Sequence, residues 1–168
     1  MNQSGMTRIE LLIVILIIGL LGLAAAVAVG SARSSTRDAV RLSDVRQTQT
    51  SLELYFNDSN MYPASESFGA LGSIDMRCLS SEGFVSTCTL GQETVYMNVI
   101  SPTPEQGLKK LAGCSGAQNA YCYISTEDEY RVQFELENAN PILGLQKGLN
   151  CATERGIGAG VCSAFSIE

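Results

Sequence analysis

The feature that most constrains this chain is a long apolar run near its N-terminus. From Leu11 to Val29 there are nineteen consecutive residues without a charge, almost all of them Leu, Ile, Val, Ala or Gly. At about 1.5 Å per residue, a helix of this length measures roughly 28 Å, which is enough to cross the hydrocarbon core of a bilayer. The run therefore predicts a membrane-spanning helix. The rest of the chain has the polar composition of an ordinary globular domain.

The helical pattern continues beyond the apolar run. The side chains that recur at three- and four-residue spacing are Ala39, Leu42, Val45, Gln49, Leu52 and Phe56. This spacing is the period of an amphipathic helix. No proline occurs before Pro63, and residues 57–60 form a cluster of turn-forming side chains. We therefore expect one continuous helix from about Met6 to Phe56, apolar all round in its first half and amphipathic in its second.

The charged residues are unevenly distributed. Residues 1–58 contain five basic and five acidic side chains, so the net charge of −6 belongs entirely to the remainder of the chain. An acidic domain repels phosphate backbones, and direct nucleic-acid binding is not expected. Within the helix, Arg41 lies three residues from both Asp38 and Asp44. Such pairs of opposite charge are expected on the solvent-exposed face.

The C-terminal part is expected to form a head of short strands and loops. Alternating apolar and polar residues predict strands at 121–125 and 130–136, joined by a hairpin turn at 126–129. The other expected elements are a strand at 94–100, a short helix at 105–112 and an irregular tail at 150–165. Tyr55, Phe56 and Tyr62 are expected in the core between helix and sheet. The fold class is therefore α+β, with the long N-terminal helix packed on a small antiparallel sheet.

Six cysteines all follow the apolar run, namely Cys78, Cys88, Cys114, Cys122, Cys151 and Cys162. An even number in a part of the chain that would be exported indicates disulfides. Fifteen pairings are possible; the short spacings favour Cys78 with Cys88, Cys114 with Cys122, and Cys151 with Cys162, each contributing about 2–3 kcal/mol. A metal site is not expected, because the chain has no histidine and no C-x-x-C pair. The acidic residues at 127–129 fit a solvated turn better than a calcium site.

Glu10 lies one residue before the apolar run, where a charge is costly and suggests a function. A partner would exist if the chain were cut after Gly5, because Met6 would then carry a new α-amino group. Between two staggered helices packed side by side, the carboxylate of one could neutralise the amine of the next. Such a buried polar contact can set the register of a polymer.

The segment from Gly5 to Leu12, with the sequence GMTRIELL, resembles the class III signal sequence of type IV pilins and type II secretion pseudopilins. The segment LELYFNDSNMYP at 52–63 looks like the end of the long pilin helix and its turn into the head. The resemblance implies that a prepilin peptidase cleaves between Gly5 and Met6 and N-methylates Met6, and that Glu10 is the assembly residue. Many members have proline where Val27 stands, so helix flexibility is expected instead at Gly19, Gly22 or Gly30.

The resemblance also implies a domain organisation and a set of partners. It divides the chain into a leader peptide at 1–5, a transmembrane and filament-core helix at 6–30, the amphipathic half of that helix at 31–57, and a pilin head at 58–168. The implied partners are further copies of the chain through the N-terminal helix, the prepilin peptidase, and the assembly platform with its ATPase. Before assembly the subunit would sit in the cell membrane with its N-terminus in the cytoplasm. After assembly it would be part of an extracellular pilus.

Three alternatives remain open on the sequence alone. A pseudopilin of a secretion or competence system would form a short periplasmic fibre. A conventional secretory signal would be cut in the alanine-rich segment 24–28. A single-pass anchor would hold an extracellular binding domain that never polymerises. An enzyme is not expected, because the chain has no histidine, no G-x-S-x-G and no P-loop, and it offers no set of catalytic or cofactor-binding residues.

Overall fold

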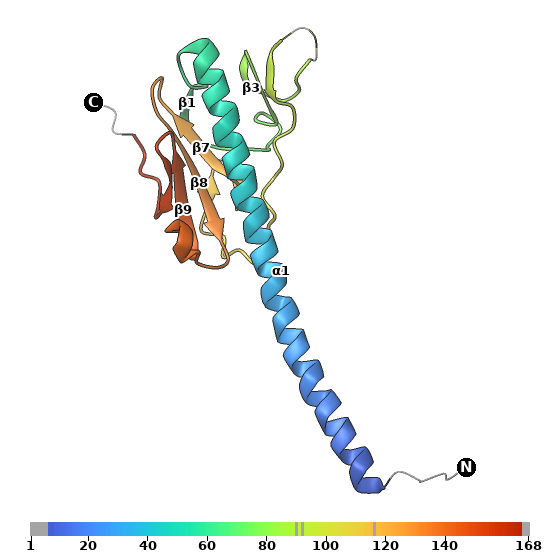
Figure 1. Cartoon of the computed structure of the whole chain (residues 1–168). Coiled ribbons are helices and arrows are strands. Elements are labelled where there is room, and N and C mark those ends of the chain that lie inside the picture. Colours follow the sequence, from blue (N-terminus) through green and yellow to red (C-terminus); the bar gives the residue numbers. More distant parts are fainter. Residues whose placement is uncertain (1–6, 90, 92, 116, 166–168) are drawn as a thin grey trace.

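The computed structural model describes residues 7–89, 91, 93–115 and 117–165. One helix, α1 (Arg8–Ser59), extends over 52 residues and dominates the shape of the molecule (Figure 1). Its first half projects alone as a stalk, and its second half lies against the head. The predicted continuous helix is therefore confirmed from Arg8 onward, whereas Met6 lies outside the described residues.

The helix ends three residues later than predicted. Asn60 caps it in the left-handed conformation, with φ 54°, and donates its backbone N–H to the carbonyl of Phe56 at 2.8 Å. Asparagine tolerates this conformation better than most residues, so it can close a helix where glycine is absent. The boundary between helix and head consequently falls at residues 59–60 rather than at 57–58.

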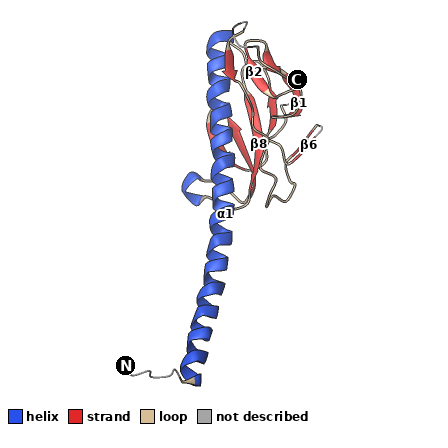
Figure 2. Cartoon of the chain, turned by 90° about the vertical axis from the view of Figure 1, so that its right-hand side faces the viewer, coloured by secondary structure: helices blue, strands red, loops and turns tan. Residues whose placement is uncertain are grey.

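Short antiparallel strands make up the described part of the head. They are β1 (Ser65–Ala70), β2 (Cys78–Ser80), β3 (Gly83–Val85), β4 (Val95–Met97), β5 (Gly113–Cys114), β6 (Ala117–Gln118), β7 (Cys122–Ser125), β8 (Tyr130–Leu136), β9 (Gly148–Thr153) and β10 (Gly156–Ala159). A five-stranded sheet has the order β1-β7-β8-β9-β10, a three-stranded sheet the order β3-β2-β4, and β5 pairs with β6. Helix α1 packs along the two larger sheets and contacts β4, β8 and β9 (Figure 2). The predicted α+β architecture is confirmed.

The predicted hairpin forms the centre of the large sheet. Tyr123 pairs with Val132, and the turn is closed by a hydrogen bond from the N–H of Thr126 to the carbonyl of Glu129 at 2.8 Å. The alternation seen in the sequence is the alternation between the two faces of β8. This strand runs from the upper end of the head, beside the end of α1, to the lower end where the stalk leaves it.

The predicted helix at 105–112 is wrong, because this segment is a turn followed by chain without regular secondary structure. Its backbone polar groups are satisfied by distant side chains instead of by a helical ladder. The Glu135 carboxylate accepts the N–H groups of Lys109 and Leu111 at 2.6 and 3.0 Å. The Arg41 guanidinium donates to the carbonyl of Gln106 at 2.6 Å. Tertiary contacts have thus replaced the local hydrogen bonds that a helix would make.

The prediction of an irregular tail is wrong for residues 150–159, whereas residues 160–165 have no regular secondary structure. Residues 148–153 and 156–159 form β9 and β10, and β9 pairs with β8 along its full length. Glycines at 148, 156 and 158 lower the intrinsic strand preference of this segment and concealed it in the sequence. Between β8 and β9 the chain also forms a short 3-10 helix, η1 (Pro141–Leu143).

The buried face of α1 is rotated relative to the predicted one. Its fully or nearly fully buried side chains are Arg41, Val45, Thr48, Ser51, Leu52 and Tyr55. Val45 and Leu52 were predicted, but Ala39 is exposed. The prediction that Arg41 lies on the wet face is wrong, because its side chain is 0% exposed.

Aromatic side chains fill the core above this face. Tyr55, Phe56 and Tyr62 pack there as predicted, and the rings of Tyr62 and Tyr130 meet edge to face with centroids 4.8 Å apart. Tyr123 lies in the same cluster, 4.9 Å from the ring of Phe84. Such edge-to-face pairs add to the stabilisation from apolar burial. The head is thus anchored to the upper half of α1 and has no such core around the stalk.

Candidate functional site: the exposed stalk and its junction with the head

The stalk, defined as residues 8–33 of α1, begins with a capping box. The backbone N–H of Glu10 donates to the Thr7 hydroxyl at 3.3 Å, and the Glu10 carboxylate accepts the N–H of Thr7 at 3.4 Å. The carboxylate therefore points back toward the start of the helix. The T-x-x-E spacing was visible in the sequence and signals this cap, which the sequence analysis missed. Gly5 and Met6, the residues of the predicted cleavage, lie outside the described residues.

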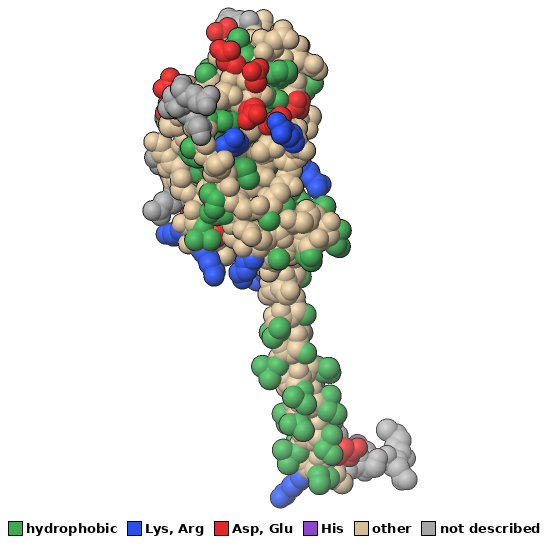
Figure 3. Space-filling model, turned by 90° about the vertical axis from the view of Figure 1, so that its left-hand side faces the viewer, with side chains coloured by type: hydrophobic (Ala, Val, Ile, Leu, Met, Phe, Trp, Pro, Cys, Tyr) green, Lys and Arg blue, Asp and Glu red, His purple; other side chains and the backbone are tan. Residues whose placement is uncertain are grey.

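The stalk displays its apolar side chains on every face. Ile9, Leu23 and Val27 are 69%, 70% and 75% exposed, and none of the most apolar 18-residue window of α1 is buried. Figure 3 shows hydrophobic side chains all along the projecting part of the helix. The helix is long and apolar enough to cross a membrane. So much exposed apolar surface requires cover by lipid or by other protein.

Three glycines lie in the stalk without a packing reason inside this chain. A Cβ built on Gly19, Gly22 or Gly30 would meet no atom within 4 Å. Glycine costs a helix about 0.5–1 kcal/mol relative to alanine. In membrane helices, small residues permit close approach of a second helix. The glycines therefore fit a helix that packs against something outside the single chain.

A cluster of four charged side chains fixes the stalk to the head, and we call it the junction cluster: Arg37, Asp38, Arg41 and Glu137. The Arg37 guanidinium donates Nε and Nη2 to the two carboxylate oxygens of Glu137 at 2.6 and 2.7 Å. Arg41 donates Nη1 to both Asp38 and Glu137 at 2.8 Å. Asp38 in turn accepts the backbone N–H of Glu137 at 2.9 Å. Three residues of α1 and the residue that directly follows β8 are thereby held in one geometry.

Arg41 also reaches the loop that follows the small sheet. Its Nη2 donates to the carbonyls of Pro104 and Gln106, each at 2.6 Å. The cluster therefore ties three separate segments of the chain together around one buried guanidinium. Arginine suits this role because its planar head holds several donors in a fixed geometry.

The electrostatics of the junction cluster favour the charged forms. The hydrogen bonds from Arg37 hold the pKa of the Glu137 carboxyl below its ordinary value, against the opposing effect of burial. The same contact with Glu137 raises the pKa of Arg37. Each group therefore stabilises the ionised state of the other. This cluster is not predicted from the sequence; the available signal is Arg41 itself, a charged residue four positions before buried Val45.

Further polar contacts fasten α1 to the head above the cluster. Tyr121 donates its hydroxyl to the Asp44 carboxylate at 2.9 Å, and Tyr96 does the same to Asp58 at 2.7 Å. The predicted pairing of Arg41 with Asp44 is thus replaced by one with Tyr121. Burial raises the pKa of Asp44, and the hydroxyl of Tyr121 opposes this effect. The upper half of the helix is consequently held along its length and not at one point.

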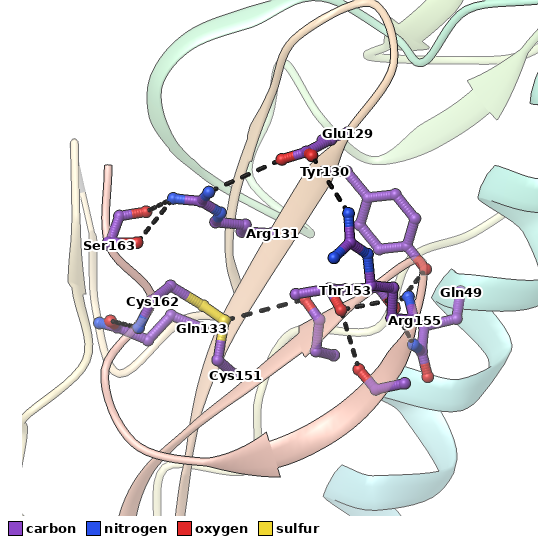
Figure 4. Close-up of a disulfide and its surroundings, with 12 residues drawn as sticks. Gln49, Glu129, Tyr130, Arg131, Gln133, Cys151, Thr153, Arg155, Cys162 and Ser163 are labelled. Atoms are coloured by element: carbon purple, nitrogen blue, oxygen red, sulfur yellow. Dashed lines mark hydrogen bonds and ion pairs between the residues drawn. A yellow bond between two sulfur atoms is a disulfide. The ribbon is translucent and has the colours of Figure 1, made fainter. Parts of the chain in front are cut away.

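Three disulfides cross-link loops of the head. The structure joins Cys78 to Cys88, Cys114 to Cys122 and Cys151 to Cys162, the sequential pairs favoured by their spacing, with Cα atoms 5.9, 5.4 and 5.2 Å apart. Figure 4 shows the last pair on the five-stranded sheet.

Side chains around this disulfide connect the sheet to the tail and to the helix. The Gln133 side chain accepts the N–H of Cys162 at 3.2 Å, and Arg131 donates to the carbonyl of Ser163 (Figure 4). Gln49 of α1 donates to the carbonyl of Thr153 at 2.8 Å. The tail is therefore fixed to the sheet, and the sheet to the helix.

The predicted site residues do not converge on one pocket. Glu10 and the three glycines are distributed along the stalk, and the cysteines are all in the head. Among the described residues, no group of three or more metal-ligating side chains is close enough to hold an ion. The arrangement offers a surface for packing and not a cavity for chemistry. No family model, curated protein or solved structure matches this chain.

Proposed function

We propose that this protein is the structural subunit of a type IV pilus-like filament, held in the membrane by its stalk and then polymerised through it. The observation that carries the proposal is the continuity of α1. The same rigid helix that exposes an apolar stalk is clasped by the junction cluster and the aromatic core. A flexible link between anchor and head is absent from residues 8–59, where the chain is helical throughout. A subunit built this way transmits the position of its stalk directly to its head.

The chemistry of the stalk supplies both storage and cohesion. In the membrane its apolar side chains are covered by lipid, and in a filament they are covered by the stalks of neighbouring copies. Removal of residues 1–5 by a prepilin peptidase would give Met6 a free amine for the Glu10 carboxylate of a neighbour. That charge pair sets the stagger of adjacent copies. An assembly platform and its ATPase would supply the work of extraction.

The main proposal is a major pilin that serves motility, adhesion or DNA uptake. A pseudopilin with a short periplasmic fibre is the second, and the abundance of surface filament distinguishes the two. A membrane-tethered binding domain is a more distant alternative. It is disfavoured because a tether does not need a rigid, clasped helix or glycines that face empty space.

The decisive experiment is N-terminal mass analysis of protein recovered from sheared cell-surface material. The proposal expects a mature chain that begins at Met6 and is heavier by one methyl group. A chain that begins near Val27 or Val29 would mean an ordinary secreted protein. An intact chain found only in membranes would favour the tethered domain.

Variants at the cleavage site and at Glu10 test the mechanism separately. Gly5→Val should block processing and leave membrane insertion intact. Glu10→Ala should give a processed, inserted subunit that assembles poorly, but it also removes the capping box. Glu10→Gln keeps the cap, because glutamine can serve in the same position, and removes only the charge. Wild-type filament levels in Glu10→Gln would refute the charge pairing; Glu82→Ala, at an exposed site in the head, is the control.

A further inference from the structure

The lower end of the head, where the stalk leaves it, carries exposed cations beside exposed aliphatic side chains. We call this the neck surface, made of Arg33, Lys109, Lys110, Leu111, Ile142 and Lys147. Hydrogen bonds from the backbone of Lys109 and Leu111 to Glu135 place that loop at the end of β8. Lys147 directly precedes Gly148, which pairs with Leu136, the last residue of β8.

The charges of the neck surface are available for a partner. Within the described ranges, none of its four cations has an ion-pair partner within 4 Å. Arg37 and Arg41 nearby are instead neutralised by Asp38 and Glu137. Exposed Glu105 follows Pro104 in the same loop and offsets one charge. The remaining excess is positive, although the protein as a whole has a net charge of −6.

The opposite end of the head is acidic. It holds the turn at 127–129, with three consecutive carboxylates, and the residues Glu53 and Asp58 near the end of α1. In Figure 3 one group of Lys and Arg side chains lies where the head meets the stalk, whereas most Asp and Glu side chains lie in the far half of the head, together with other Lys and Arg side chains. The head is therefore polarised along the helix axis.

The apolar part of the neck surface is unusually accessible. Ile142 is 94% exposed and Leu111 is 50% exposed. Ile142 belongs to η1, which lies at the lower end of the five-stranded sheet, next to β9 (Figure 1), and protrudes beside α1 in Figure 2. Flanking cations and a protruding aliphatic side chain are the combination with which proteins insert into the headgroup region of a bilayer.

The stalk fixes this surface at the membrane. Arg33 follows Val29 by four residues, or about 6 Å along a helix. When residues 11–29 cross the bilayer, Arg33 therefore lies at headgroup depth. The 3-10 helix η1, which carries Ile142, lies farther along α1, beside Ala39 and Leu42. A tilt of α1 toward the head, within the range usual for membrane helices, brings η1 down to the headgroups. Neighbouring copies that span the membrane at the same depth have their neck surfaces at the same height. The acidic end of a neighbouring head therefore cannot reach the neck surface.

We propose that the neck surface binds an anionic lipid bilayer and holds the head against the membrane before assembly. Arg33 and the three lysines contact phosphate headgroups, and Ile142 enters the interface between them. The inference rests on the membrane-spanning part of the proposed function and not on the filament. It assigns a second contact with the membrane, separate from the apolar stalk.

Tryptophan scanning tests the contact, because the chain contains no tryptophan. Three single variants of the full chain, Leu21→Trp, Ile142→Trp and Met61→Trp, would be reconstituted in vesicles with brominated lipids. Leu21 reports insertion of the stalk. Met61, 46% exposed, is the matched control at the opposite end of the head. The vesicles would contain phosphatidylcholine alone or phosphatidylcholine with phosphatidylglycerol.

The proposal expects Ile142→Trp to be quenched at least about twofold more with phosphatidylglycerol, with a blue-shifted emission that high salt reverses. Met61→Trp should remain unquenched in both. Equal behaviour of these two variants while Leu21→Trp is quenched would overturn the inference and leave the proposed function standing. If none of the three variants were quenched, the proposal that the stalk spans a membrane would itself be overturned. If the emission of Ile142→Trp shifted with the amount of protein per vesicle and not with the lipid charge, the inference would be overturned. The neck surface would then contact a second copy of the chain.

A charge variant provides the second arm. Replacing Lys109, Lys110 and Lys147 by glutamine should abolish the effect of phosphatidylglycerol on Ile142→Trp. The matched control replaces two exposed arginines of the head outside the neck surface, Arg77 and Arg155, by glutamine and should retain that effect. The reverse pattern would overturn the assignment of the lipid contact to the neck surface.

Discussion

Glu137 is the residue on which the junction between stalk and head depends most directly. Its carboxylate accepts hydrogen bonds from two arginines, and its side chain is only 9% exposed. Glu137→Gln would leave the fully buried Arg41 without part of its compensating charge. Removal of one partner of a buried ion pair typically costs about 3 kcal/mol. We expect a loss of that size in the free energy of unfolding, measured by urea titration of the head.

The matched control is Glu129→Gln. Glu129 also lies between two arginines, Arg131 and Arg155, but at distances of 3.7 and 3.6 Å and with 41% of its side chain exposed. Exposed pairs of this kind contribute little to stability. Equal losses in the two variants would show that burial of the junction cluster has no special effect.

The same carboxylate makes the junction sensitive to acid. The contact with Arg37 lowers the pKa of Glu137 below the ordinary 4.5, so the folded state binds fewer protons than the unfolded chain. Its contribution to stability is therefore complete above about pH 4.5 and is lost as the pH falls through the lowered value. Burial raises the pKa of Asp44, which has the opposite effect on stability. The pH dependence of the wild type alone therefore does not isolate the contribution of Glu137. We expect the stability difference between wild type and Glu137→Gln to shrink between pH 7 and pH 3, and a constant difference would contradict the assignment.

At the level of elements, α1 shows which structural features can be predicted from the sequence and which cannot. Its length, its apolar first half and the strands β7 and β8 follow from periodicity, which is a local property. The burial of Arg41 does not follow from local periodicity, because its partner Glu137 is 96 positions away along the chain. Strand β9 was missed for the same reason: Gly148 and the glycines of the adjoining β10 weaken the local signal, and pairing with β8 supplies the stability. The candidate stalk residues were visible in the sequence, whereas the junction cluster required the fold.

The stalk should tolerate a large side chain at Gly22 as a monomer but not in an assembly. A Cβ at this position meets nothing within 4 Å. Gly22→Leu should therefore keep the helix content of the detergent-solubilised subunit, measured by circular dichroism. A neighbour packed closely against this glycine would be displaced, and filament yield should fall about tenfold, equivalent to about 1.4 kcal/mol.

Leu23→Ile, at a site that is 70% exposed, is the control for a conservative apolar change on the same helix. It should leave both helix content and yield unchanged. Normal filaments from Gly22→Leu would mean that this face of the stalk stays open in the assembly.

The hairpin of β9 and β10 is the element that most needs its disulfide. Cys151 lies in β9, and Cys162 follows the exposed, glycine-rich β10. Replacing both cysteines by serine should lower the free energy of unfolding by about 2–3 kcal/mol. Urea unfolding of the variant, compared with the wild type, measures the loss. An unchanged midpoint would show that pairing of β9 with β8 holds the tail by itself.

At the scale of the whole molecule, the two halves of α1 face different environments and are held by different forces. The upper half is fixed by buried aromatic rings and by charged contacts that work in water. The stalk contributes no buried side chain to the head, and its stability depends on whatever covers it. This division suits the proposed transfer of the subunit from lipid into a filament, because the head need not change when the surroundings of the stalk do.

The same division predicts that the head is energetically independent of the stalk. A fragment of residues 30–168 keeps the junction cluster, the aromatic core and the three disulfides, and it loses only side chains that the head does not contact. We expect it to remain in solution without detergent and to unfold with the same urea midpoint, within about 0.5 kcal/mol, as the full chain in detergent. A fragment of residues 45–168, which also lacks Arg37, Asp38 and Arg41, is the matched comparison. It should be clearly less stable, because it loses every ion pair of the junction cluster and the contacts of Arg41 with Pro104 and Gln106. If both fragments lost stability equally, the stalk itself would be supporting the head, and the rigid junction would not be the boundary between the two halves.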